Sequence, residues 1–184
     1  MRTAAEWLPP VKASGITAYL IASAACALTA ARVPGKRIAR LAAVLCALDL
    51  AQLLDIAFAL RWKIYDVLKS GALRHHWYAE RAGPQVAALI VMAAVLLVSG
   101  VWLCRRFTSI RGAALAICGG LLSIGCWLAE IISLHATDVI LYRRAGPLMV
   151  ISFVWMLACA MTTAGMLMAG ASSFRCVTKS RTNI

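Results

Sequence analysis

The stretch PQVAALIVMAAVLLVSGVWLC, residues 84–104, decides the fold class of this chain. It contains 21 residues and no Asp, Glu, Lys or Arg. A helix of about 20 apolar residues is long enough to cross the roughly 30 Å hydrocarbon core of a bilayer. The stretch therefore predicts a transmembrane helix.

Four further apolar runs along the chain are long enough to do the same. The predicted spans cover residues 15–31, 38–60, 84–104, 112–134 and 147–171. A transmembrane β-strand would instead alternate polar and apolar residues over about ten positions, and these runs do not. The sequence predicts an all-α fold: a polytopic integral membrane helix bundle of about five transmembrane helices, in one membrane domain over residues 1–184.

The composition agrees with this fold class. Hydrophobic residues make up 62% of the chain and charged residues only 14%, whereas a soluble domain carries about a quarter charged residues. The formal net charge is +12, but the Lys and Arg residues lie between the apolar runs, where they anchor helix ends to lipid headgroups. This placement favours the lipid bilayer as partner and argues against nucleic acid.

Cysteine and methionine are frequent, and packing explains both. Nearly all seven cysteines lie inside apolar runs and none forms a Cys-x-x-Cys pair, which predicts buried thiols rather than disulfides. The fifth predicted span is rich in methionine, and core packing is favoured there over a copper relay. At the N-terminus, Glu6 and the pair Pro9-Pro10 argue against a cleaved signal peptide.

The connections predict an orientation. Segments 32–40, 105–111 and 175–184 are basic and contain no acid. With five spans, all three fall on one side, and the positive-inside rule assigns that side to the cytoplasm. We expect an N-terminus outside and a cytoplasmic C-terminus, in a bacterial inner membrane.

The second and fourth spans are expected to continue beyond the membrane. The residues that follow them, RWKIYDVLKS and HATDVILYRR, keep an apolar pattern that fits two or three further helical turns. Ser70-Gly71 then predicts a helix end, and residues 72–81 predict a short interfacial helix.

The tetrapeptide Arg-Ala-Gly-Pro occurs twice, at 81–84 and 144–147, each time before a long apolar run. Further matches are Asp55-Ile56 with Glu130-Ile131, and Asp66-Val67 with Asp138-Val139. The pattern favours a parallel duplication of a helical hairpin, spans 2–3 and 4–5. Pro suits the first helical position, so the tetrapeptide predicts the start of each returning helix, with Arg81 and Arg144 as headgroup anchors. The alternative is that these two arginines bind an anionic ligand.

Acidic residues inside the spans are the strongest functional lead, because a charged side chain at the bilayer centre costs about 2.5–3.5 kcal/mol on insertion scales. Asp49, Gln52 and Asp55 follow one another at three-residue steps and can share one helix face. Glu130 lies in the outer part of the fourth span, and no Lys or Arg lies in the interior of any span, since Arg40 is near the start of the second. These carboxyls are therefore expected to be protonated, hydrogen-bonded to polar neighbours or matched by a partner chain.

A second candidate group lies at the outer face: Arg81, Arg144, Asp66, Asp138, His76 and His135. Two alternatives use its imidazoles. One is a haem between His76 and His135, and the other is a zinc ion held by His75, His135 and Asp138. Because the histidines lie at span ends and no tight ligand motif is present, no cofactor and no metal is predicted.

Two runs of small residues predict close helix contacts. The first is Ser14, Ala18, Ala22, Cys26 and Ala30, and the second is Gly112, Ala116 and Gly120, followed by Gly125, Ala129 and Ser133. They fit either a tight bundle or a surface that docks on another membrane protein.

The chain shows no nucleophile motif, no phosphate-binding glycine loop and no His-Glu-x-x-His, so we do not expect an enzyme. The first hypothesis is a non-catalytic subunit, assembly or binding component of a larger membrane complex, or a homo-oligomer. The alternative is a small proton- or ion-coupled transporter that uses the intramembrane carboxylates. A third hypothesis is an outer-face haem or metal redox protein.

Overall fold

The computed structural model describes residues 9–33, 35–74, 82–132 and 135–181. Five helices are long and apolar enough to cross a membrane: α1 (Pro9–Arg32), α2 (Lys36–Phe58), α4 (Ala82–Arg106), α5 (Ala113–Ile132) and α7 (Val150–Arg181). Shorter elements lie between them: α3 (Leu60–Arg74), α6 (His135–Leu141), β1 (Arg144–Ala145) and β2 (Leu148–Met149). The prediction of an all-α fold with five helices that could cross a membrane is confirmed for the described residues.

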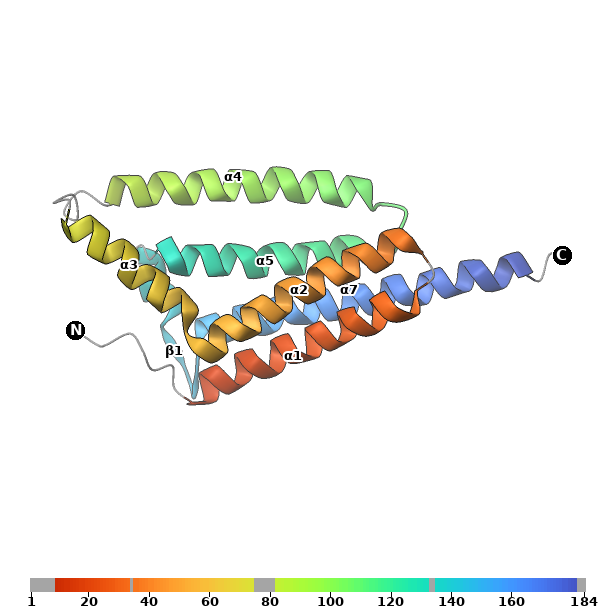
Figure 1. Ribbon diagram of the computed structural model, residues 1–184, viewed down its shortest axis with the longest axis horizontal. Coiled ribbons are helices and arrows are strands. Elements are labelled where there is room, and N and C mark those ends of the chain that lie inside the picture. Colours follow the sequence, from red (N-terminus) through yellow and green to blue (C-terminus); the bar gives the residue numbers. More distant parts are fainter. Residues whose placement is uncertain (1–8, 34, 75–81, 133–134, 182–184) are drawn as a thin grey trace.

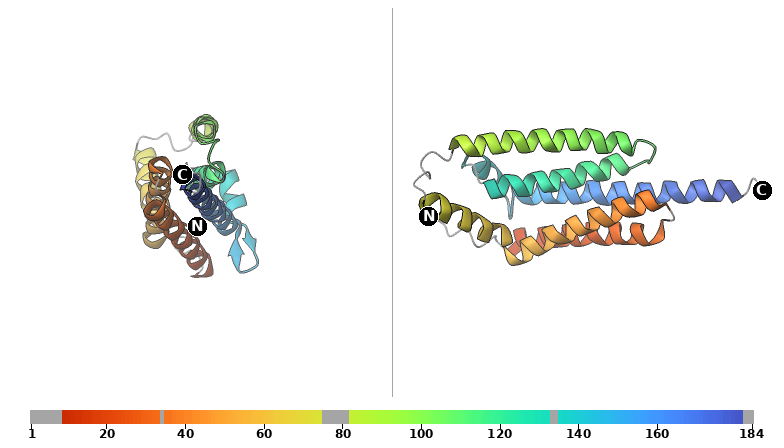
Figure 2. Two further views of the ribbon diagram at one scale, coloured as in Figure 1. Left: turned by 90° about the vertical axis from the view of Figure 1, so that its right-hand side faces the viewer. Right: turned by 45° about the horizontal axis from the view of Figure 1, so that its top comes forward.

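The five long helices pack in an order that differs from their order in the chain. Helix α1 packs against both α2 and α7, and α7 packs against α5. Helix α4 packs on the far side of α5, at the edge of the bundle (Figure 1 and Figure 2). The spatial order is therefore α2, α1, α7, α5, α4, with α1, α7 and α5 in the interior.

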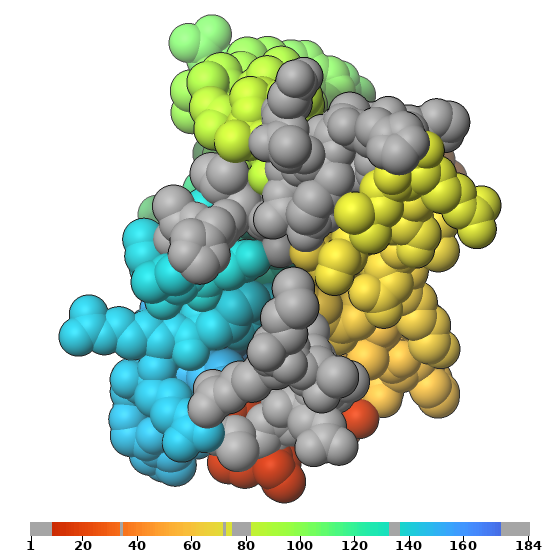
Figure 3. Space-filling model, turned by 90° about the vertical axis from the view of Figure 1, so that its left-hand side faces the viewer, coloured from red at the N-terminus to blue at the C-terminus, as the bar shows by residue number. Residues whose placement is uncertain are grey.

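The two ends of the bundle differ in chemistry. The connections α1–α2 and α4–α5 and the last turns of α7 lie at one end (Figure 1). This end carries all three acid-free basic segments, and we call it the basic end. Helices α3 and α6 and the strands β1 and β2 lie at the other, the hairpin end. Seen end-on, α3 lies on one side of the hairpin end and the β-hairpin on the opposite side (Figure 3).

Glycines hold α5 and α7 at backbone contact. Gly112, before α5, has φ +85°, and a Cβ there would lie 2.5 Å from the Gly165 carbonyl oxygen. A Cβ on Gly119 would lie 2.6 Å from the Ala158 carbonyl oxygen. Such separations are too short for any side chain, which is how small residues let membrane helices approach. The close contact expected from Gly112 is confirmed, while Gly119 and Gly165 were not singled out from the sequence.

The extension of α2 beyond the membrane follows a sharp break. Ala59 adopts the left-handed conformation, with φ 53° and ψ 41°, and separates α2 from α3. A non-glycine residue rarely adopts this conformation, so the break could not be predicted from the sequence. Helix α3 then runs through Ser70-Gly71 to Arg74, so the predicted helix end at Ser70-Gly71 was wrong. Residues 75–81 of the predicted interfacial helix lie outside the described residues.

The second Arg-Ala-Gly-Pro segment forms a β-hairpin instead of a helix start. Arg144 pairs with Met149, and Ala145 with Leu148. Gly146 has φ +68°, and the φ of about −65° imposed by Pro147 completes a two-residue turn. Helix α7 begins only at Val150, so the prediction of Pro147 at the first helical position was wrong.

The first Ala-Gly-Pro does form the start of a helix. Ala82 is the first residue of α4, and Pro84 lies in its first turn, where the missing N–H would have no helical partner. Arg81 lies outside the described residues. The two copies of the tetrapeptide therefore have different structures.

Candidate functional site

A buried arginine at the hairpin end contacts the acids of two spans. Arg61 Nε donates to Asp55 Oδ2, and Arg61 Nη1 donates to Glu130 Oε2. Arg61 is only 1% exposed, and both carboxylates are buried. The pairs tie α2 and α3 to α5, and we call Asp55, Arg61, Glu130 and the neighbouring Tyr142 the Arg61 cluster.

The break at Ala59 places Arg61 beside Asp55. Asp55 lies in the last turn of α2, and the left-handed Ala59 turns the chain so that α3 starts next to it. Asp55 Oδ1 accepts from the backbone N–H of Arg61 at 2.6 Å. Asp55 thus both caps the N-terminus of α3 and pairs with the guanidinium.

Aromatic residues enclose the cluster. Arg61 Cζ lies 5.5 Å from the centre of the Trp155 ring, within the range of a cation–π contact. A Cβ on Gly15 would lie 2.8 Å from the Trp155 ring, so the missing side chain in α1 leaves room for the indole. Trp155 of α7, which packs against Gly15 of α1, therefore covers Arg61 and helps to keep it from solvent.

Tyr142 completes the cluster from the segment between α6 and β1. Its hydroxyl donates to Glu130 Oε1 at 3.0 Å, and its ring centre lies 5.9 Å from that of Trp62. Burial raises the pKa of Tyr142 above its ordinary value. The phenol therefore keeps its proton, and remains a donor to Glu130, throughout the neutral range.

The expectation that no cation reaches the intramembrane acids was wrong for Asp55 and Glu130. Arg61 lies outside the apolar part of α2 in the sequence, but the turn at Ala59 brings it back against Asp55. Glu130 reaches the same guanidinium from α5. One indirect sequence signal pointed to Arg61 as a partner of these acids: it is the first charged residue after the span, and Trp62 follows it.

Asp49 lies in a different environment on the same helix. It is 1% exposed near the middle of α2, and Gln52 and Asp55 are buried as well. The Cys26 thiol of α1 lies 3.9 Å from Asp49 Oδ2, which is a weak hydrogen bond. In the part of the chain that the structure describes, Gln52 Oε1 has no hydrogen-bond partner. The buried polar face of α2 thus changes from a thiol-bonded carboxyl at Asp49 to an ion-paired one at Asp55.

The residues of the predicted outer-face cluster are only partly described. Asp66 and Arg144 are exposed, whereas Asp138 is half-buried and its carbonyl accepts from the Tyr142 backbone N–H at 2.9 Å. His76 and Arg81 lie outside the described residues, as does the side chain of His135, the first residue of α6. The acids at matching positions of the predicted repeat, Asp55 and Glu130, instead meet at Arg61.

Within the described ranges, no three His, Cys, Asp or Glu side chains lie close enough to hold a metal ion. Comparison of the chain with protein families, with curated proteins and with solved structures finds no match.

Proposed function

We propose that this chain is a non-catalytic, multi-pass inner-membrane protein that assembles with a second membrane protein, or with a second copy, through α4. The proposal includes an N-terminus outside, a cytoplasmic basic end and an origin of spans 2–3 and 4–5 by duplication. The basic end supports the orientation because its Lys and Arg residues have no acid beside them.

One observation carries the assembly proposal. In each of the other four spans, a third or more of the most apolar window is buried inside the bundle, whereas in α4 none of it is. Among the described residues, only one stripe of α4 packs, against α5, where Gly100 meets Leu121 and Gly125 meets Leu96. A helix with one neighbour leaves most of its circumference for lipid or for a partner helix.

The rigidity of the bundle agrees with a scaffold role. The Arg61 cluster joins α2, α3 and α5 at the hairpin end, and glycine contacts hold α5 to α7 towards the basic end. A buried ion pair that ties several helices together is a device for fixing one arrangement. A fixed bundle presents α4 at one orientation.

Matched substitutions test the assembly proposal. Val98 in α4 and Val44 in α2 are 68% and 64% exposed, and each lies eight residues from the basic end of its helix. We expect Val98→Trp to abolish the higher-mass complex of the wild-type protein in native mass spectrometry from mild detergent, and Val44→Trp to leave it intact. A wild-type protein that is monomeric in detergent and in nanodiscs would refute the proposal.

A second candidate function is proton-coupled transport, and Asp49 favours it. A carboxyl near mid-membrane with only a thiol beside it is expected to hold a proton at rest. Two carboxylates on one guanidinium also leave the Arg61 cluster with an excess negative charge that one proton would neutralise.

Liposomes that contain the purified protein and a pH-sensitive dye test this second candidate. We expect Asp49→Asn to abolish protein-dependent proton flux, whereas Asp66→Asn, at an exposed acid outside the spans, should leave it unchanged. Wild-type liposomes as tight to protons as protein-free ones would exclude this function.

A further inference from the structure

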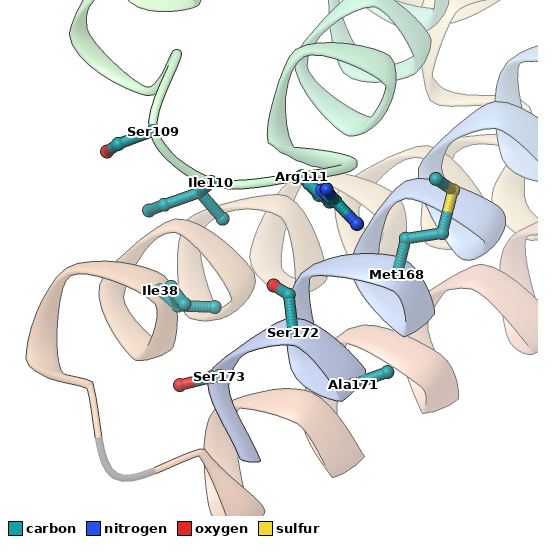
Figure 4. Close-up of a pocket in the computed structure, with 8 residues that line it drawn as sticks. All are labelled: Ile38, Ser109, Ile110, Arg111, Met168, Ala171, Ser172 and Ser173. Atoms are coloured by element: carbon teal, nitrogen blue, oxygen red, sulfur yellow. The ribbon is translucent and has the colours of Figure 1, made fainter. Parts of the chain in front are cut away.

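A cavity of about 630 Å³ opens at the basic end of the bundle, away from the Arg61 cluster. It lies between the first turns of α2, the α4–α5 connection and the last turns of the α7 span (Figure 4). Its polar lining comes from Arg111 and from Ser109, Ser172 and Ser173. A volume of this size falls within the usual range of small-ligand pockets.

The charge around this cavity has one sign. Seven basic residues belong to the two connections at this end: Arg32, Lys36, Arg37, Arg40, Arg105, Arg106 and Arg111. No Asp or Glu lies in residues 7–48 or 81–129, so the nearest acid on α2 is Asp49, near its middle. An anion in the cavity would meet a positive potential that no neighbouring carboxylate offsets.

The other walls of the cavity are apolar. Ile38 of α2, Ile110 of the connection and Met168 of α7 line it. In Figure 4 the Ser172 side chain points from α7 toward the connection that carries Ile110 and Arg111. The Ser172 hydroxyl donates to the Ala169 carbonyl at 2.9 Å, and one rotation about χ1 would redirect it into the cavity. A ligand that suits this lining combines an anionic group with an apolar body.

We propose that this cavity binds the phosphate group of an anionic phospholipid, with Arg111 as the principal contact. The guanidinium offers two parallel donors to phosphate oxygens, and the serine hydroxyls offer weaker ones. Ile38, Ile110 and Met168 contact the glycerol and the first methylene groups. Because the cavity lies where α2 and α7 leave the membrane, a lipid reaches it from the bilayer without entering water. Basic pockets at this level between membrane helices are typical sites for anionic headgroups.

The test compares two arginines of one connection. Purified full-length protein is placed in phosphatidylcholine nanodiscs that contain a minor fraction of phosphatidylglycerol. The protein is then released from the nanodisc, and the lipid that stays bound to it is identified by native mass spectrometry. We expect the wild type to retain phosphatidylglycerol in preference to phosphatidylcholine. Arg111→Ala should reduce this retention at least about tenfold, because both charge-assisted hydrogen bonds from the guanidinium are lost. Arg105→Ala makes the same charge change outside the cavity and should retain the lipid.

Three further outcomes decide the proposal. Arg111→Lys keeps the charge without the paired donors. Retention of phosphatidylglycerol below that of the wild type and above that of Arg111→Ala would support the proposal. Equal loss in Arg111→Ala and Arg105→Ala would overturn it, because the attraction would then be a general effect of charge. Inorganic phosphate that binds with the same dependence on Arg111, while phosphatidylglycerol is not retained, would overturn the lipid as the ligand. Both Arg105 and Arg111 are exposed, so elution at the wild-type volume in size-exclusion chromatography is expected for each variant.

Discussion

Asp49 and Asp55 lie on the same face of α2, less than two turns apart, yet the bundle treats them differently. Asp55 has a guanidinium, a backbone N–H and a helix N-terminus beside it, whereas Asp49 has a thiol at 3.9 Å. Both are buried. Two carboxyls on one face of a span can therefore have different partners, because the turn at Ala59 brings Arg61 back to Asp55 and not to Asp49.

The largest effect is expected for removal of the shared cation. Arg61→Ala would leave the carboxylates of Asp55 and Glu130 buried without Arg61, and breaking a buried pair in this way costs about 3–5 kcal/mol. We expect a loss of that size in the free energy of unfolding in detergent, measured by denaturant titration. Arg61→Lys keeps the charge but not the separate guanidinium donors to the two carboxylates, and its free energy of unfolding should fall by less. A cost of Arg61→Ala below about 1 kcal/mol would show that the pairs contribute nothing net.

Asp55→Asn removes one partner and keeps the other. Arg61 would still pair with Glu130, and the amide oxygen could still cap α3, so we expect a loss of about 2 kcal/mol, the range for one hydrogen bond to a charged group. The measurement is the same denaturant titration. An effect as large as that of Arg61→Ala would mean that Asp55 alone holds the arginine.

Tyr142→Phe deletes only the hydroxyl that donates to Glu130. A single hydrogen bond to a carboxylate contributes about 1.5 kcal/mol, and we expect this loss in the free energy of unfolding. Because burial raises the pKa of Tyr142, the phenol is neutral below its ordinary pKa, and its stabilising bond would be lost only as the pH rises through the raised folded-state pKa. The difference between wild type and Tyr142→Phe should therefore be constant between pH 6 and pH 9. A difference that falls within that range would contradict the assignment of the hydroxyl as donor.

A substitution at Ala59 tests the left-handed turn that places Arg61 beside Asp55. Ala59→Gly relieves a left-handed alanine, and we expect a gain of about 1 kcal/mol in the free energy of unfolding. The matched control is Ala57→Gly, inside α2, which should cost about 0.5–1 kcal/mol. Equal signs for the two substitutions would contradict the left-handed turn at Ala59.

Asp49→Asn is expected to change stability least. The amide replaces a carboxyl that is expected to be neutral and keeps its shape, so the free energy of unfolding should change by less than about 0.5 kcal/mol. Thermal unfolding of Asp49→Asn and Asp55→Asn under the same conditions compares the loss of stability in the two variants. A loss equal to that of Asp55→Asn would show that Asp49 is ionised and held by a cation.

The sequence was a good guide to the spans and a poor guide to the connections. The five apolar runs predicted the helices because a bilayer allows few alternatives to a helix of about 20 residues. The two copies of Arg-Ala-Gly-Pro show that a short sequence pattern does not determine the local structure. Gly83 is helical and Gly146 has a positive φ, because glycine and proline are compatible with both a helix start and a tight turn.

Part of the candidate site could be predicted from the sequence. Asp49, Gln52, Asp55 and Glu130 stood out as polar residues in apolar surroundings, but Arg61 did not. Its partners lie six and 69 positions away. The conformation that turns it inward belongs to an alanine, which carries no turn signal.

By itself, the sequence determined that the chain is an α-helical membrane protein with five spans and a basic end, because hydropathy and span length leave few alternatives. Tertiary structure decided which helices are neighbours, which acid is paired and which helix stays at the edge. These outcomes depend on single contacts between distant residues: Gly15 against Trp155, Gly112 against Gly165, and Arg61 between Asp55 and Glu130. No local pattern encodes such contacts, because each exists only when both helices are in place.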